Sequence, residues 1–112
     1  MIKGMHGTFF TPEAEAARRF IQEKLGFSHV DAGDGWLIFD VPKAEFGIHP
    51  GDDTHHEISF WCDDIEATVS DLQDKGVVFK SPVEDQGFGL VTAFELPGGV
   101  EVLLYEPRHP QP

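Results

Sequence analysis

The apolar positions of this 112-residue chain follow two different periods in turn. Two stretches carry apolar residues at helical spacing, which predicts one amphipathic helix in each. The apolar residues with this spacing are Ala14, Ala17, Phe20, Ile21 and Leu25 in the first stretch, and Ile65, Val69 and Leu72 in the second. Around these stretches, short segments rich in Val, Ile, Phe, Trp and Tyr are bounded by Gly, Pro and Asp, which is typical of strands joined by turns.

The first half of the chain is echoed in the second half at an offset of 51 residues. A strand, an acidic helix and a terminating glycine keep their order in both copies, which indicates a duplicated supersecondary unit. The matched positions include Thr8 with Ser59, Phe9 with Phe60, Phe10 with Trp61 and, after one deletion, Gly26 with Gly76.

Each copy is predicted to contain a strand, a helix and three further strands. In the first copy, Thr11 and Pro12 are suited to begin the helix and Gly26 to end it, with strands at 2–10, 28–31, 36–41 and 45–49. In the second copy, Asp63 and Asp64 begin the helix and Gly76 ends it, with strands at 57–62, 77–80, 89–96 and 100–105. The chain is therefore predicted to be α+β, with modules at about 2–50 and 55–106 and a tail at 107–112. The glycine-containing stretch 84–90 is interpreted as either a lid or an ordinary hairpin connection.

Alternation along the predicted strands sorts their side chains onto two faces. The more apolar set should meet the helix, so the other set should line an inner cavity. Four strands each send a His or a Glu to this second face, which predicts a shared polar site. The set comprises His6, Thr8 and Phe10; Glu45, Gly47 and His49; Glu57, Ser59 and Trp61; and Glu101, Leu103 and Tyr105.

Composition and charge narrow the classes of partner. A formal net charge of −12 repels phosphate backbones and anionic membranes, which argues against nucleic-acid and membrane-surface roles and is compatible with cationic small molecules. Such a charge also simply keeps a protein soluble, so it assigns no ligand by itself.

The chain contains no apolar run of ~20 residues and no signal-peptide pattern at its start, so we expect a cytoplasmic protein. Cys62 stands alone, which excludes an internal disulfide, and it is expected to be a small buried hydrophobe.

Three segments carry a resemblance to a known family. The stretch "EATVSDLQDKGV", the preceding "CDDI" and the closing "LPGGVEVLLYEP", in two βαβββ modules, resemble the vicinal oxygen chelate superfamily of glyoxalase I, bleomycin-resistance proteins, fosfomycin-resistance enzymes and extradiol dioxygenases. The resemblance covers about residues 2–107. It implies a single domain over residues 1–112, in which the two modules form a cupped, mostly antiparallel sheet, and it implies a homodimer. Because this fold hosts several unrelated chemistries, it specifies function poorly.

The resemblance also suggests metal ligands. His6 matches the first ligand position and Glu57 the second, and the repeat independently sets these two residues opposite each other. The last ligand position falls on Leu103, but Glu101 lies two residues earlier on the same face and is the candidate third ligand. His49 is a second-rank candidate.

Such a nitrogen-and-oxygen site would suit Mn, Fe, Ni, Co or Zn. Glu57 or Glu45 would then act as general base. His55 and His56 just precede the second ligand position and are expected in the turn at the rim of the site.

Three interpretations of function stay open. The preferred one is a divalent-metal-dependent lyase, isomerase or ring-cleaving dioxygenase. The second is a metal-free protein that sequesters a cationic aromatic ligand, as bleomycin-resistance members do, and the third is a dimeric domain without chemistry. In the first two, the residues expected to contact the small molecule are Phe10, Ser59, Trp61, Leu103 and Tyr105.

Overall fold

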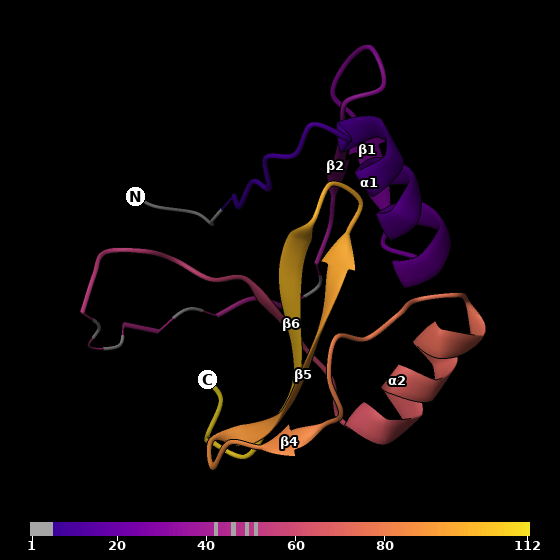
Figure 1. Cartoon of the computed structure of the whole chain (residues 1–112). Coiled ribbons are helices and arrows are strands. Elements are labelled where there is room, and N and C mark those ends of the chain that lie inside the picture. Colours follow the sequence, from indigo (N-terminus) through magenta and orange to yellow (C-terminus); the bar gives the residue numbers. More distant parts are fainter. Residues whose placement is uncertain (1–5, 42, 46, 49, 51) are drawn as a thin grey trace.

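The fold is known from a computed structural model, which describes residues 6–41, 43–45, 47–48, 50 and 52–112. Within these residues the chain is α+β, as predicted. Two helical segments lie on one side of a four-stranded sheet, and a two-stranded hairpin stands beside the first of them (Figure 1). None of the helices in the described ranges combines the length and apolar composition that crossing a bilayer requires.

The four-stranded sheet belongs entirely to the second half of the chain. Its strands follow the order β3 (Ser59–Trp61), β6 (Val100–Pro107), β5 (Gly89–Leu96) and β4 (Glu84–Asp85). β3 runs parallel to β6, and the other two pairings are antiparallel. The stretch after β4 is a tight hairpin turn closed by a bond from Gln86 N to Gly89 O of 2.9 Å, so the hairpin interpretation holds and the lid does not.

Both helices confirm the internal repeat. α1 (Ala14–Phe20) continues into a π-helical turn, η1 (Ile21–Leu25), and α2 spans Ile65–Asp74, so the two helices begin at the predicted 51-residue offset. Asp64 caps α2 by accepting a bond from Ala67 N at 3.1 Å. Gly26 and Gly76 follow the two helices with φ of 71° and 88°, the left-handed conformation that glycine adopts without steric cost.

The start of α1 differs from the prediction, because Glu13 rather than Thr11 precedes the helix and provides no side-chain cap. The Thr11 hydroxyl instead accepts a bond from Glu13 N at 3.2 Å and donates one to Pro97 O at 3.0 Å. Thr11 thereby joins the N-terminal half of the chain to the β5–β6 turn, a long-range partner that no local pattern reveals.

The β5–β6 turn provides a test of this junction. Gly98 has φ of 94°, and a Cβ built on it would overlap the Thr11 hydroxyl. We expect Gly98→Ala to lower the free energy of unfolding by about 2–4 kcal/mol through backbone strain and overpacking together. Gly99→Ala is the control: Gly99 has a similar φ of 86°, but nothing lies within 4 Å of its added Cβ, so only the strain of about 1–2 kcal/mol applies. Equal losses in urea denaturation would show that the contact with Thr11 contributes nothing.

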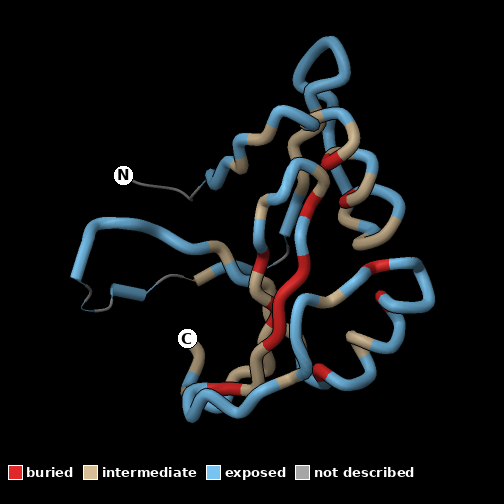
Figure 2. Tube along the Cα trace, viewed as in Figure 1, coloured by how far each residue is buried: buried red, intermediate tan, exposed pale blue. Residues whose placement is uncertain are grey.

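The core lies between the helices and one face of the sheet (Figure 2). On β6, Val102 and Leu104 are buried while Glu101, Leu103 and Tyr105 are not, which confirms the predicted alternation. The buried cluster consists of Ala17, Ile21, Ile65, Leu72, Val77, Phe94, Leu96, Val102 and Leu104.

In its described residues, the first module forms less sheet than predicted. β1 (His29–Asp31) pairs antiparallel with β2 (Leu37–Phe39), and both are short. The predicted strand at 2–10 is wrong for residues 6–10, which are all described and lie outside any strand. Of the strand predicted at 45–49, residues 45, 47 and 48 are described, and they also lie outside any strand. The strand predicted at 77–80 is reduced to one bridge, from Phe79 to Phe94. The physical reason is that a β-prone segment becomes a strand only where a neighbouring edge accepts its hydrogen bonds.

Candidate ligand site on the open sheet face

The face of the sheet that points away from the helices is hereafter called the open face. The register sets its side chains in rows across the strands, because residues paired on neighbouring strands project to the same side. Ser59 and Ala93 flank Leu103 in one row, and Trp61 and Val91 flank Tyr105 in the next. With Glu95 and Glu101 in a third row, the open face consists of Ser59, Trp61, Val91, Ala93, Glu95, Glu101, Leu103 and Tyr105.

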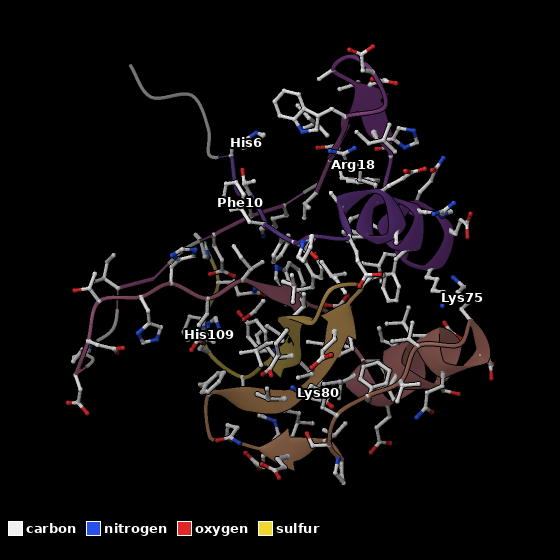
Figure 3. All side chains as sticks on the ribbon, turned by 45° about the horizontal axis from the view of Figure 1, so that its top comes forward. His6, Phe10, Arg18, Lys75, Lys80 and His109 are labelled. Carbon is white, nitrogen blue, oxygen red and sulfur yellow. The ribbon has the colours of Figure 1, made fainter. Side chains whose placement is uncertain are left out.

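A hollow of about 340 Å³ lies at the Glu101 end of the sheet, where Glu101 and Leu103 of the open face line it together with Val100 of the opposite face. Three segments far apart in the sequence line it, and they bring together four of the predicted site residues: Phe10, Glu57, Glu101 and Leu103. The other lining residues are Thr8, Phe9, His56, Ile58 and Val100. His6 is exposed and lies outside this lining, on the same N-terminal segment as Phe10 (Figure 3).

The carboxylates of the third row are paired with a lysine. Lys80 Nζ lies 2.7 Å from Glu101 Oε2 and 3.0 Å from Glu95 Oε1. Hydrogen bonds to these two carboxylates raise the pKa of Lys80 above its usual value, and the bond to Glu101 has the larger effect. Lys80 therefore offsets part of the negative charge beside the hollow, a role that the sequence did not suggest because nothing in the strand pattern pairs position 80 with 95 and 101.

The two neighbouring histidines have different surroundings. His55 Nδ1 lies 3.0 Å from Asp53 Oδ1, and His55 Nε2 lies 3.6 Å from Glu57 Oε1, so this imidazole is paired with acidic neighbours in the segment that precedes β3. His56 lines the hollow together with Glu57. Both histidines were predicted at the rim of the site, whereas only His56 lines the hollow.

The proposed metal ligands do not gather into one group. Among the described residues, no cluster of three or more His, Cys, Asp or Glu side chains could hold a metal ion. Glu101, one of the three proposed ligands, is bonded to Lys80, and His6 lies outside the hollow that holds Glu57. The second-rank candidate, His49, lies outside the described residues. The donor set seen here does not fit a divalent ion, and the metal site remains a prediction.

The other end of the open face carries an aromatic cluster around Tyr105. The rings of Phe88 and His109 lie 6.0 Å and 5.9 Å from the Tyr105 ring, the first edge-on and the second stacked. Burial of the phenol raises the pKa of Tyr105, and the charge of the Glu45 carboxylate adds to the effect. Glu45 accepts a bond of 2.6 Å from Gln111 Nε2 and is absent from the hollow lining. The two proposed general bases therefore lie in different places, Glu57 at the hollow and Glu45 beside Tyr105.

Cys62 lies at the end of β3, partly buried against the core. Burial is the main cause that raises the pKa of its thiol. Because the thiolate is the reactive form, this environment disfavours a nucleophilic role. Cys62 was expected to be a small buried hydrophobe, and it packs against the core but is only partly buried.

Solved structures share this fold over nearly its whole length. TnmS3, an antibiotic binding protein from Streptomyces sp. CB03234, is 24% identical, with coverage of 96% of this chain and 98% of that chain and a TM-score of 0.68. A member of the glyoxalase/bleomycin resistance protein/dioxygenase superfamily from Sphaerobacter thermophilus is 25% identical, with coverage of 93% and 97% and a TM-score of 0.69. A lactoylglutathione lyase from Agrobacterium tumefaciens is 13% identical, with coverage of 92% of each chain and a TM-score of 0.69.

These relatives differ in function, so the similarity identifies a fold and not a reaction. None of the curated proteins compared with the chain matches it. The family described as the Glyoxalase/Bleomycin resistance protein/Dioxygenase superfamily matches residues 5–104, which confirms the resemblance found in the sequence. The chain is a member of the glyoxalase/bleomycin resistance protein/dioxygenase superfamily.

Proposed function

We propose that the open face binds a planar, cationic small molecule without a metal ion, so that the protein sequesters its ligand. The observation that carries this proposal is the lining of the hollow, where Glu57 and Glu101 stand beside Phe10 and Leu103. A carboxylate next to apolar surface favours a positively charged partner that also fills the apolar space.

Aromatic surface near the hollow supports the same ligand class. Phe10 is 88% exposed, and the rings of Trp61 and Tyr105 lie on the same face of neighbouring strands. The negative face of an aromatic ring attracts cations, and planar ligands stack on it. The net charge of −12 adds a long-range field that raises the local concentration of cations.

The proposal is tested with proflavine, a planar aromatic cation, as the probe. We expect proflavine to raise the melting temperature in buffer containing EDTA, because a ligand that binds only the folded state stabilises it. The aromatic anion 8-anilinonaphthalene-1-sulfonate is the charge control and should have a much smaller effect. Equal stabilisation by both dyes, or by neither, would contradict a cation site.

Lys80 provides a sharper prediction. Because Lys80 Nζ is bonded to Glu101 and Glu95, Lys80→Gln should free both carboxylates and tighten proflavine binding about two- to fivefold, as expected for partly exposed charges. Lys75→Gln removes the same charge at the end of α2 and is the control for net charge (Figure 3). Isothermal titration compares the two variants, and equal tightening in both would mean that the carboxylates beside Lys80 do not contact the ligand.

A metal-dependent lyase, isomerase or dioxygenase is the second candidate. It would use His6, Glu57 and Glu101 as metal ligands, and the observation in its favour is that two of these three residues, Glu57 and Glu101, line one hollow. Its test is elemental analysis of protein purified without a histidine tag, followed by melting with added Mn, Fe, Ni, Co or Zn. Stoichiometric metal that is lost in His6→Ala and retained in His55→Ala would establish it over the metal-free site.

We further propose that the protein is a homodimer, which is supported by apolar residues on segments that have no strand partner in the described chain. Phe10 and Ile48 are 88% and 92% exposed. Ile48 belongs to the connection between β2 and β3, whose described residues include an arm that projects from the body of the chain (Figure 1). A second copy would cover such surface, and light scattering of the purified protein tests it: a monomer mass at micromolar concentration would contradict the dimer.

A further inference from the structure

The last residues of the chain, predicted as a plain tail, return to the sheet. Arg108 N donates to Phe88 O at 2.8 Å, and the Arg108 guanidinium lies 3.2 Å from Asp85 Oδ2. The C-terminus consequently lies beside the strands, near the β4–β5 turn, instead of running into solvent (Figure 1).

The tail then covers the aromatic end of the open face. The His109 ring is stacked on Tyr105, with 29° between the ring planes, and His109 Nε2 lies 3.3 Å from the Tyr105 hydroxyl. Two residues further on, Gln111 donates to the Glu45 carboxylate at 2.6 Å. The tail therefore occupies one aromatic ring and one carboxylate, the two kinds of group that a planar cation would use.

Geometry brings this end within reach of a ligand in the hollow. Leu103 lines the hollow, and Tyr105 is the next residue of β6 on the same face, roughly 7 Å away at the usual rise of a strand. A ligand of three fused rings spans such a distance. It would meet His109 on the Tyr105 ring, and two planar groups cannot stack on the same side of one ring.

From these contacts we propose that residues 108–112 form a strap that competes with the ligand for the Tyr105 end of the open face. The inference rests on the proposed function, that this face binds a planar cation. The strap is releasable because its ion pair is exposed, with Arg108 and Asp85 side chains 50% and 60% accessible, and exposed pairs contribute little to stability. A ligand that binds only molecules whose strap is released then shows an apparent affinity equal to its intrinsic affinity multiplied by the fraction of such molecules.

The test compares proflavine binding to the full chain with binding to a chain that ends at Pro107. If the strap is closed in most molecules, we expect the shortened chain to bind about three- to tenfold more tightly. The shortened chain also lacks the charge of Arg108, so Arg108→Gln in the full chain is the charge-matched control and should show a smaller gain. Circular dichroism and melting establish that each variant is folded.

Substitution of His109 gives a second measurement that leaves the rest of the tail in place. His109→Ala removes the ring that covers Tyr105 and should reproduce part of the gain in affinity, whereas His109→Phe keeps a stacked ring and should reproduce little of it. In parallel, the ¹⁵N heteronuclear NOE of residues 109 and 111 should be as high as that of β6 in the free protein and should fall when proflavine is added.

The outcomes separate the two proposals. Equal proflavine affinity in the full and shortened chains, or a low NOE at residues 109 and 111 before any ligand is added, overturns the strap and leaves the proposed function standing. Absence of proflavine binding in both chains overturns the proposed function, and the strap with it.

Discussion

Replacing Phe94 with Ala is expected to lower the free energy of unfolding by about 3–5 kcal/mol. Phe94 is 1% exposed and lies at the centre of the core, where its ring is 6.1 Å from the Phe20 ring of α1 and 5.8 Å from the Phe79 ring. Removing the ring leaves a cavity between α1 and the sheet that rigid strands cannot close. Guanidinium denaturation followed by far-UV circular dichroism measures the loss.

Phe88→Ala is the matched control for this substitution. Phe88 is 52% exposed and contacts Tyr105 edge-on at 6.0 Å, so the same change of side chain should cost only about 1 kcal/mol. A loss at Phe94 no larger than that at Phe88 would mean that the helices do not pack on this face of the sheet. In that case the opposite face would not be the open one.

Replacing Leu103 with Arg is expected to weaken proflavine binding at least thirtyfold, which corresponds to about 2 kcal/mol. Leu103 lines the hollow that also holds Glu57 and Glu101. A guanidinium at this position would fill the hollow, pair with the carboxylates and repel a cationic ligand. Because Leu103 is only partly buried, the fold should tolerate the change, and isothermal titration measures the affinity.

Val78→Arg is the control for the added charge. Val78 is 82% exposed and is not among the residues that line the hollow, so it changes the net charge equally without entering the site. We expect it to weaken proflavine binding by less than about threefold through the long-range field alone. Comparable losses in both variants would show that proflavine responds to the overall charge and does not bind in the hollow.

The parts of the fold that the sequence predicts well are those determined by local patterns. The apolar stripes and the glycines at 26 and 76 gave both helices, and alternation along β6 separated buried Val102 and Leu104 from the open face. The strands predicted at 2–10 and 45–49 are not formed by their described residues, 6–10, 45, 47 and 48, because pairing depends on a distant edge, which propensity does not report. A second copy of the chain, if the protein is a dimer, is one source of such an edge.

The candidate site was predictable in part. Alternation sets Glu57, Glu101 and Leu103 on one face, and all three line the hollow, but so do Ile58 and Val100 from the set predicted to face the helix, so alternation alone does not define the lining. Two features were missed: the pairing of Lys80 with Glu101, and the return of His109 to Tyr105. Both depend on residues without regular periodicity whose partners are set by tertiary contacts, so no sequence pattern announced them.

The most direct test of a metal-free cation site uses Trp61 as its own reporter. Trp36→Phe leaves Trp61 as the single tryptophan of the 112-residue chain, and Trp61 pairs with Tyr105 on the open face. With EDTA present, we predict that proflavine quenches this fluorescence in a saturable way at one dye per chain, and that Leu103→Arg abolishes the effect. Quenching that never saturates, or that appears only after a divalent metal is added, would contradict the account.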